Sequence, residues 1–368
     1  MLKNQNKRAL VELTSFGSNP GALKCWLYLP SILAPKTPLV VVLHGCTQDA
    51  AGFDRGSGWT QLAEETGFAV LFPEQQRANN ANLCFNWFEP GDTRRDAGEA
   101  RSIREMIGHA MEAHGLDRGK VFITGLSAGG AMANVMLATY PELFAGGAII
   151  GGLPYGVASG VGQAFERMQG RNTPSVTSLR SALAPTSSRG NSLPRISIWH
   201  GTHDQTVRPV NAEQVASQWV GAHGGDDATD NITTVNGHTR KVWLDKQGNE
   251  AVELYLIKGM AHGVPLSVSG KVPLGETGAF MLETGISSTA RIAKSWNIVG
   301  DLDVATFEGT AKSPSPQPVF DSVESLVEKA MSYAKSKTPA KVAAGRNGHG
   351  DGVGKIITDA LRAAGLMK

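Results

Sequence analysis

Short apolar runs bounded by turn residues recur along this chain, and they predict β-strands. The run at 38–45 is apolar throughout, which is expected of a strand that is buried on both faces of a sheet. The run at 23–30 alternates between apolar and polar residues and predicts a half-exposed strand. The remaining expected strands are 68–73, 120–125, 145–152, 195–201 and 252–259.

Helical patterns lie between these runs. The longest spans 97–115, and the residues on its expected buried stripe are Ile103, Met106, Ile107, Ala110, Met111 and His114. Shorter helices are expected at 58–67 and 131–141, ended by glycine and proline respectively. Strands that alternate with helices predict an α/β fold with a mainly parallel, doubly wound sheet and helices on both faces.

Three segments lack a regular pattern. Residues 171–194 are rich in Ser, Pro and Thr, so we expect a surface loop with little secondary structure, placed to act as a lid. Residues 221–250 predict a hairpin insertion that turns at 246–249. Residues 301–368 predict a polar linker and C-terminal helices, packed on or beside a domain that spans 1–300.

The composition argues against several classes of partner. The 368 residues carry a formal net charge of +2, which favours neither a nucleic acid nor an anionic membrane surface. No apolar stretch approaches the ~20 residues that span a bilayer. The polar N-terminus lacks the apolar core of a secretory signal, so we expect a cytoplasmic chain, or a secreted one if a signal has been removed. The oligomeric state is left open.

A serine lies in a glycine-rich motif directly after the expected strand 120–125. Gly125, Ser127 and Gly129 match G-x-S-x-G, and a helical pattern follows them. This is the context of a nucleophile elbow, a sharp turn that presents a serine hydroxyl at the positive end of the following helix. The chain has 44 glycines, so the motif alone also fits a chance match.

A serine nucleophile needs a base, and the base needs an acid that orients it. In this architecture the acid and then the base follow the serine, each after a strand. We predict Asp204, after the strand 195–201, as the acid and His262, after the strand 252–259, as the base. The alternatives are the aspartates Asp226, Asp227 and Asp230 and the histidines His200 and His203.

Attack on an ester creates an oxyanion, and backbone N–H groups must already point toward it. One donor is expected in the residue after the nucleophile, which is Ala128. The second donor is expected in the segment "LHGCTQ" at 43–48, where we predict the amide of Cys46, with Gly45 and Thr47 as alternatives.

Five segments together resemble the polyhydroxybutyrate (PHB) depolymerase family of esterases, which are related to feruloyl and acetylxylan esterases. They are "VVLHGCTQ", "LCFNWFEP", "GLSAGGAMANVMLATYPELFAGGAIIGGLPYG", "WHGTHDQTV" and "GMAHGVPL", within residues 15–298. The resemblance implies an α/β-hydrolase fold, with Ser127 as nucleophile, Asp204 as acid, His262 as base and the "HGC" amide in the oxyanion hole. It also implies hydrolysis of esters of short 3-hydroxy acids, or of related aliphatic or aryl esters, without a metal or cofactor.

The sequence departs from the secreted, polymer-degrading members of that family. The tail at 299–368 lacks the pattern of a β-rich polymer-binding module, and "HGVPL" stands where many depolymerases have H-x-W-P-G. We therefore expect a serine esterase of short-chain esters, with 3-hydroxybutyrate-type oligoesters as the leading substrate. The alternatives are a feruloyl or acetylxylan esterase and an acyltransferase on the same fold.

Aromatic residues and cysteines near the expected site leave two questions open. Phe85 and Trp87 either form an apolar wall that contacts substrate or belong to the core beneath a long loop. Cys46 and Cys84 either form a bridge that pins this loop to the oxyanion segment or remain free thiols. The third cysteine, Cys25, is expected to be a small buried side chain, and no Cys or His spacing predicts a metal site.

Overall fold

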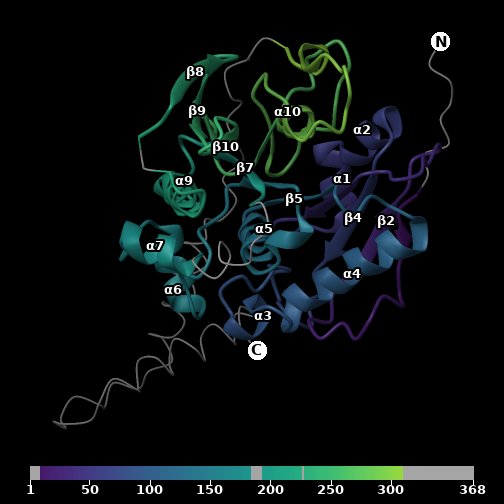
Figure 1. Cartoon of the computed structure of the whole chain (residues 1–368), viewed down its shortest axis with the longest axis horizontal. Helices are drawn as coiled ribbons and strands as arrows, with labels where there is room; N and C mark the ends of the chain where they lie inside the picture. Colours follow the sequence, from purple (N-terminus) through teal and green to yellow (C-terminus); the bar gives the residue numbers. More distant parts are fainter. Residues whose placement is uncertain (1–8, 184–192, 226–227, 310–368) are drawn as a thin grey trace, which may run out of the picture.

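A ten-stranded sheet forms the centre of the computed structural model, which describes residues 9–183, 193–225 and 228–309 (Figure 1). The strand order is β1-β2-β4-β3-β5-β6-β7-β10-β9-β8, and the neighbours from β4 to β10 in this order are parallel. Antiparallel pairs extend both edges of the sheet. The strands are β1 (Val11–Glu12), β2 (Lys24–Tyr28), β3 (Leu39–Leu43), β4 (Ala69–Glu74), β5 (Val121–Leu126), β6 (Gly146–Ile150), β7 (Arg195–Gly201), β8 (Asn231–Val235), β9 (His238–Leu244) and β10 (Glu250–Ile257), with a separate pair β11 (Val264–Leu266) and β12 (Met281–Glu283).

Strand β3 shows why the middle of the sheet is apolar on both faces. Leu39, Val41 and Leu43 belong to the core on one face, while Val40 and Val42 belong to the core on the other. Because side chains alternate along a strand, a strand between two layers of helices needs an apolar residue at every position. The unbroken apolar run therefore predicted the burial of this strand correctly.

Helices cover both faces of the sheet, as the sequence predicted. Side chains of α4, α5 and α9 join the core on one face, and those of α1, α2 and α10 join the core on the other (Figure 1). The predicted stripe on α4 is buried, except that His114 is only half-buried. The helices are α1 (Ala50–Ser57), α2 (Trp59–Thr66), α3 (Pro90–Thr93), α4 (Gly98–His114), α5 (Ala128–Thr139), α6 (Val161–Met168), α7 (Val176–Ala182), α9 (Val210–Ala222) and α10 (Ser288–Ser295), with the 3-10 turns η1 (Pro141–Leu143) and η2 (Val304–Phe307).

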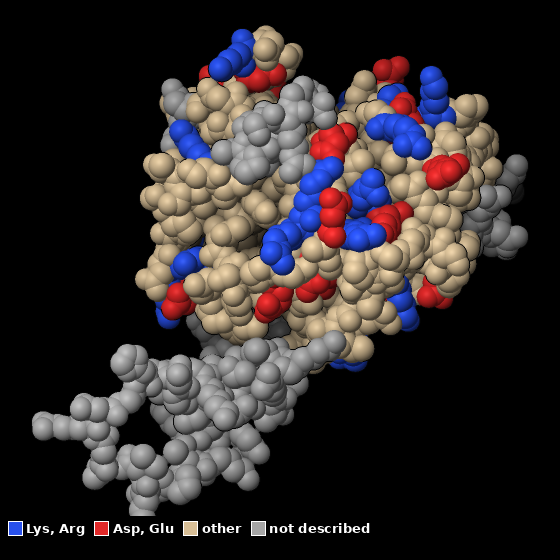
Figure 2. All heavy atoms as spheres, turned by 60° about the horizontal axis from the view of Figure 1, so that its bottom comes forward, with Lys and Arg blue, Asp and Glu red and all other residues tan. Residues whose placement is uncertain are grey.

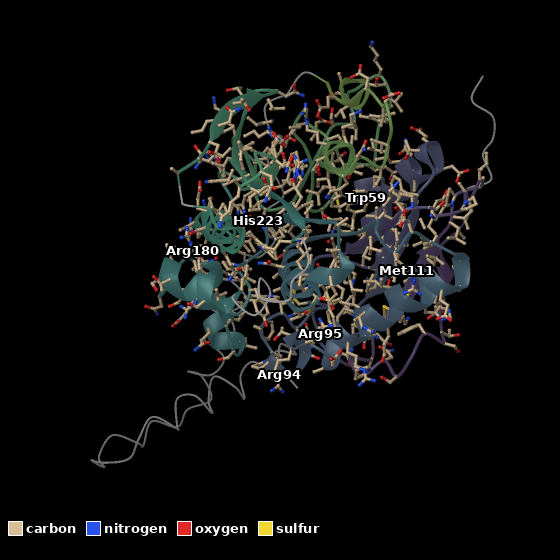
Figure 3. All side chains as sticks on the ribbon, viewed as in Figure 1. Trp59, Arg94, Arg95, Met111, Arg180 and His223 are labelled. Carbon is tan, nitrogen blue, oxygen red and sulfur yellow. A yellow bond between two sulfur atoms is a disulfide. The ribbon has the colours of Figure 1, made fainter. Side chains whose placement is uncertain are left out.

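An aromatic stack joins α2 and α10 to the sheet. The ring of Trp59, the first residue of α2 and labelled in Figure 3, lies 5.9 Å from the ring of Trp296, which follows α10. Trp296 also stacks on Phe122 of β5, and the centroids of these two rings lie 4.8 Å apart. Such stacked pairs add about 1 kcal/mol each to the stabilisation that burial provides. The stack therefore holds the C-terminal end of α10 against α2 and against strand β5.

Part of the expected loop at 171–194 is helical. The helix α7 begins after its N-cap Ser175, whose hydroxyl accepts the amide of Ser178. Leu179 of this helix and Leu183 at its C-cap are buried in the core, so two apolar residues four positions apart dock a segment that is otherwise polar. The prediction of an irregular segment is wrong for α7, because its overall composition hid these two residues. Residues 184–192 of the expected lid lie outside the described residues.

The hairpin predicted at 221–250 has one more strand than expected. Strands β9 and β10 turn at 245–249, where the Asp245 carboxylate accepts the amides of Gln247 and Asn249. Strand β8 precedes β9 and is joined to it through Asn236 and Gly237, whose φ values are 48° and 81°. Asn-Gly is the dipeptide that favours such a turn, so the sequence contained a signal for β8.

Strand β2 has the alternating burial that its pattern predicted. Cys25 and Leu27 are at most 3% exposed, whereas Lys24 is exposed and Trp26 is half-buried. Tyr28, the last residue of the strand, is 6% exposed and departs from the alternation. The expectation of a half-exposed strand is therefore confirmed for most of its length.

The packed body continues beyond residue 300, where the sequence placed its limit. Phe307 is 1% exposed within the core, and the carboxylate of Glu308 pairs with Arg291 on α10. The segment therefore belongs to the folded body at least as far as residue 309. The tail at 310–368, predicted to contain helices, lies outside the described residues.

Charges of both signs are mixed on the surface. Figure 2 shows Lys and Arg interspersed with Asp and Glu on one face, without a broad area of a single sign. Such mixing fits the low net charge of the chain and argues against a polyanionic partner on that face. None of the helices in the described ranges is long and apolar enough to cross a membrane.

Phe307→Ala tests whether the segment after residue 300 stabilises the fold. Loss of this buried ring is expected to lower the free energy of unfolding by ~3–5 kcal/mol. Ile232→Ala is the control, because Ile232 is 61% exposed on β8. The control is expected to change the free energy by less than ~0.5 kcal/mol. Urea denaturation measures both, and equal effects of the two substitutions would contradict the assignment.

Candidate active site

Ser127 occupies a strained turn between β5 and α5. Its φ is 57° and its ψ is −119°, a conformation that L-residues rarely adopt. Its amide donates to the carbonyl of Ile150 at 2.9 Å, and its carbonyl accepts the amide of Ala131 at 2.8 Å. These bonds hold the serine at the N-terminus of α5, where the helix dipole is positive.

The glycines of the G-x-S-x-G motif are required because backbone crowds the turn. A Cβ on Gly125 would overlap the carbonyl group of Gly129. A Cβ on Gly129 would overlap the carbonyl oxygens of Leu43 and His44. The first turn of α5 therefore packs directly against the carboxyl end of β3, with no side chain between the two backbones.

Asp204 and His262 meet at the carboxyl ends of two neighbouring parallel strands. Asp204 follows β7 and His262 follows β10. The Nδ1 atom of His262 lies 2.6 Å from Oδ2 of Asp204, and the two residues are 9% and 1% exposed. His262 donates its Nδ1 hydrogen to the carboxylate, which leaves Nε2 as the atom that accepts a proton.

Both oxygens of the Asp204 carboxylate have hydrogen-bond donors. Oδ1 accepts the amides of Thr206 and Val207, each at 2.9 Å, and Oδ2 faces His262 and His200. Burial alone would raise the pKa of this carboxyl group, but the two histidines hold the pKa of Asp204 well below its usual range. Asp204 is therefore ionised and fixed in orientation.

The end of β6 neighbours both the serine elbow and the histidine. Ile150, the last residue of β6, binds the amide of Ser127 through its carbonyl. The next residue, Gly151, has a φ of 54°, and a Cβ there would stand 3.1 Å from Cε1 of His262 and 3.8 Å from Oδ2 of Asp204. Gly151 therefore leaves room for the imidazole beside the elbow.

Three amides follow β3 near the elbow, and two of them are already occupied. The amide of Gly45 donates to the side chain of Gln48 at 2.9 Å, and that of Thr47 donates to a carbonyl of the 79–88 loop at 2.7 Å. Within the described part of the chain, the amide of Cys46 has no acceptor. Ala128 begins α5, so no carbonyl of the helix accepts its amide. The Cys46 and Ala128 amides are thus the two that remain for an oxyanion.

A disulfide and a buried histidine brace this oxyanion segment. Cys46 is bonded to Cys84, which ties the segment to the 79–88 loop. His44 donates from Nδ1 to the carbonyl of Gly45 at 2.7 Å and accepts the amide of Gln75 at Nε2 at 3.1 Å. Burial lowers the pKa of His44, so the ring stays neutral, as these two bonds require. Of the two states that the sequence left open for the cysteines, the structure contains the bridged one.

The aromatic residues of the 79–88 loop lie in the core. Phe85 is fully buried, and its ring centroid lies 5.0 Å from that of His44. Trp87 is 7% exposed and packs edge-on against Phe88. Of the two interpretations that the sequence left open for Phe85 and Trp87, their burial favours the core beneath the loop over a wall of an open substrate site. Their rings pack beneath the loop and fill the apolar space between the loop and the core.

Phe280 lies at the site although no sequence motif indicated it. Its ring is edge-on to the ring of His262, with centroids 6.1 Å apart. Its φ is 61°, which is strained for an aromatic residue, and such strain is concentrated at functional sites in proteins. The carbonyl of Phe280 accepts the amide of Val264, which anchors the residue beside the histidine segment.

The rival residues do not form an alternative triad. Asp230 is exposed and accepts a backbone amide at the β8–β9 hairpin, while Asp226 and Asp227 lie outside the described residues. His203 is exposed, and His200 is buried beside the candidate acid. Asp204 and His262 are therefore the expected acid and base that the structure brings into contact.

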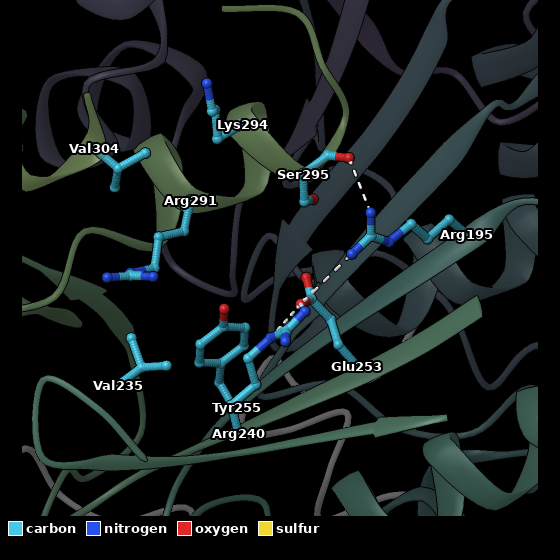
Figure 4. A pocket seen from close by; sticks show the side chains of 9 residues that line it. All are labelled: Arg195, Val235, Arg240, Glu253, Tyr255, Arg291, Lys294, Ser295 and Val304. Atoms are coloured by element: carbon cyan, nitrogen blue, oxygen red, sulfur yellow. Dashed lines mark hydrogen bonds and ion pairs between the residues drawn. The ribbon is translucent and has the colours of Figure 1, made fainter. Parts of the chain in front are cut away.

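A hollow of about 280 Å³ lies away from this site. Figure 4 shows the side chains that line it. Its wall includes Arg195, the first residue of β7, whereas Asp204 follows the last residue of that strand. The length of β7 separates the two by roughly 20 Å. Arg195 and Arg240 both pair with Glu250 and Glu253, so the charges of these four residues balance. We interpret the hollow as part of an ion-pair network that joins β7, β9 and β10.

Among the described residues, no group of three or more His, Cys, Asp or Glu side chains is placed to hold a metal ion. The cysteine outside the disulfide, Cys25, is buried in β2, as expected. Burial raises the pKa of its thiol, so this residue is a packing element rather than a nucleophile.

Known esterases match this chain over most of its described length. A sequence profile of the family described as Esterase PHB depolymerase matches residues 23–242. Poly(3-hydroxyalkanoate) depolymerase C of Paucimonas lemoignei is 42% identical over 298 residues, which cover 79% of this chain and 71% of the relative. Feruloyl esterase B of Talaromyces stipitatus is 30% identical over 271 residues, which cover 71% of this chain and 74% of the relative.

A solved structure has the same fold. The acetyl xylan esterase from Aspergillus awamori aligns with a TM-score of 0.64 at 28% identity, over 69% of this chain and 94% of that one. The expectations of an α/β-hydrolase fold and of a carboxylic ester hydrolase are confirmed by these relatives. The profile and the relatives show that the chain belongs to the PHB depolymerase family of esterases.

Proposed function

We propose that this esterase forms an acyl-enzyme on Ser127, with His262 as the general base and Asp204 as the acid that orients it. The observation that carries the proposal is the buried 2.6 Å hydrogen bond between His262 and Asp204 beside the strained elbow. A serine hydroxyl attacks an ester efficiently only when a neighbouring base takes its proton. Gly151 leaves space for the imidazole of His262 beside the elbow, which supports a base within reach of the serine.

The first half of the reaction transfers the acyl group to the enzyme. Oγ of Ser127 attacks the ester carbonyl carbon while its proton passes to Nε2 of His262, and the ionised Asp204 stabilises the imidazolium that forms. The negative charge moves to the carbonyl oxygen, where the amides of Cys46 and Ala128 bind it. The proton on His262 then passes to the leaving alcohol. Water repeats the sequence on the acyl-enzyme and releases the acid.

We propose short 3-hydroxybutyrate-type oligoesters as the substrate class. The relative at 42% identity is named a poly(3-hydroxyalkanoate) depolymerase. In this chain Val264 stands where many depolymerases have tryptophan, and it is buried in β11. A buried valine offers no aromatic surface to a solid polymer, which favours soluble oligomers.

Acetylated xylan or a feruloyl ester is the second candidate substrate. The solved relative with a TM-score of 0.64 is an acetyl xylan esterase, and a relative at 30% identity is a feruloyl esterase.

We also propose that the protein works in an oxidising compartment, since a bridge such as Cys46–Cys84 persists there and is rare in a reducing cytoplasm.

A substrate panel tests the proposal. It contains p-nitrophenyl esters from acetyl to decanoyl, the dimer and trimer of 3-hydroxybutyrate, methyl ferulate and acetylated xylan. We expect fast turnover of the short p-nitrophenyl esters and of the oligomers. Ser127→Ala is expected to lower kcat by ~10⁴-fold or more without a change in the circular dichroism spectrum.

The outcomes of the panel separate the substrate from the mechanism. Cleavage of acetylated xylan or methyl ferulate with the oligomers untouched would replace the proposed substrate class and leave the triad standing. Activity retained in the Ser127→Ala protein would overturn the mechanism.

Asp204→Asn tests the role of the acid. An amide in place of the carboxylate favours the wrong tautomer of His262, so we expect kcat to fall by ~10⁴-fold with little change in KM. Asp230→Asn is the matched control, because Asp230 is the exposed rival, and its kcat is expected to stay at the level of the unsubstituted enzyme. Steady-state kinetics on one p-nitrophenyl ester compare the two, and a similar loss in both variants would refute the assignment.

A further inference from the structure

His200 is a second histidine on the acid of the proposed triad. It lies in β7, is 1% exposed, and its Nε2 atom is 3.3 Å from Oδ2 of Asp204 and 2.7 Å from the carbonyl oxygen of Val207. Oδ2 is also the oxygen that accepts the Nδ1 hydrogen of His262. Two imidazoles therefore converge on one carboxylate oxygen.

The surroundings of His200 define its tautomer. Its Nε2 faces two acceptors, a carbonyl and a carboxylate, so this atom must carry the hydrogen. Its Nδ1 is buried and has no hydrogen-bond partner among the described residues. A proton on Nδ1 would bury a charged donor without an acceptor, which costs more than a bare ring nitrogen. His200 is therefore a neutral donor at Nε2.

His200 and Val207 enclose the carboxylate from two sides. Val207 accepts the hydrogen bond of His200 through its carbonyl and donates its amide to Oδ1 of Asp204. The two histidines are the titratable groups that act on Asp204, and the edge of the Phe280 ring faces His262 from the β12 side. The position of the acid thus depends on one short turn and one buried ring.

We propose that His200 is a positioning residue of the esterase, which fixes the plane of the Asp204 carboxylate and shares its negative charge with the hydrogen on Nε2. The inference rests on the proposed triad mechanism. Without this donor, Oδ2 loses one of its two partners and the full charge of Asp204 acts on His262. The imidazolium is then stabilised too strongly, so His262 holds its proton to a higher pH and returns it to the leaving group less readily.

Two substitutions separate positioning from simple packing. His200→Leu fills similar volume without a donor, and His200→Gln keeps an amide N–H near the position of Nε2. His203→Leu is the matched control, because it makes the same change on an exposed histidine in the loop that directly follows β7. For all three we measure kcat and KM on a short p-nitrophenyl ester from about pH 5 to pH 10, which spans the titration of a histidine base.

The pH profile decides the outcome. For His200→Leu we expect kcat to fall by about tenfold or more, KM to stay within about twofold, and the acid limb of kcat/KM to move to higher pH. His200→Gln is expected to recover most of kcat and to restore the acid limb, and His203→Leu to match the unsubstituted enzyme. A His200→Leu protein with unchanged kcat and profile would overturn the proposal, as would equal losses in the Leu and Gln variants with no shift in the acid limb.

A spectroscopic test does not depend on the folding of any variant. Nitrogen-15 NMR of histidine-labelled enzyme reports which ring nitrogen of His200 carries the hydrogen. We expect a hydrogen on Nε2 and a bare Nδ1, and a hydrogen on Nδ1 alone would overturn the proposal. Loss of activity in the Ser127→Ala protein shows separately that the triad mechanism holds, so failure of the two proposals is distinguishable.

Discussion

Close contact between backbones at the carboxyl ends of the parallel strands is the constraint on which this site depends. Gly129 lets α5 meet the end of β3, Gly151 leaves space for the imidazole at the end of β6, and Gly201 lets the end of β7 meet the carbonyl of Met260 before His262. A side chain at any of these positions would push two segments apart. Because the proposed nucleophile, acid and base lie next to these contacts, the contacts that allow the chain to pack also constrain where these groups lie.

The surrounding structure stabilises both the strained backbone of Ser127 and the buried charge of Asp204. Ser127 is held in its strained conformation by bonds to Ile150 and Ala131, and the buried charge of Asp204 is offset by three hydrogen-bond donors and by the His200 ring nitrogen at 3.3 Å. The Cys46–Cys84 bridge holds the oxyanion segment on a loop whose aromatic rings lie in the core. Strain and buried charge persist only where a rigid sheet fixes the elements around them, which is the case here.

Much of this architecture was predictable from the sequence, for identifiable reasons. Unbroken apolar runs predicted the buried strands, and the places of Asp204 and His262 after two of them predicted that these two side chains meet. The register of the parallel sheet then made the meeting point a consequence of topology.

Other features depend on tertiary contacts that leave no local pattern. The helix α7 docks through Leu179 and through Leu183 at its C-cap, Phe280 lies beside His262 in a strained conformation, and Phe85 is buried beneath its loop. The partners of the Gly45 and Thr47 amides, which favour Cys46 as the oxyanion donor, are visible only in the folded chain. The contact of His200 with the acid likewise depends on how one turn folds back on β7.

Covalent labelling with a fluorophosphonate tests the central claim most directly, because the reagent reacts with a serine only where a base activates it and an oxyanion hole binds the product. Mass spectrometry of the digested protein locates the adduct. The account predicts one phosphonyl group on the peptide that contains Ser127, and none on that peptide after heat denaturation before labelling. A phosphonyl group on a different serine of the folded enzyme, or no labelling of an enzyme that hydrolyses p-nitrophenyl esters, would contradict it.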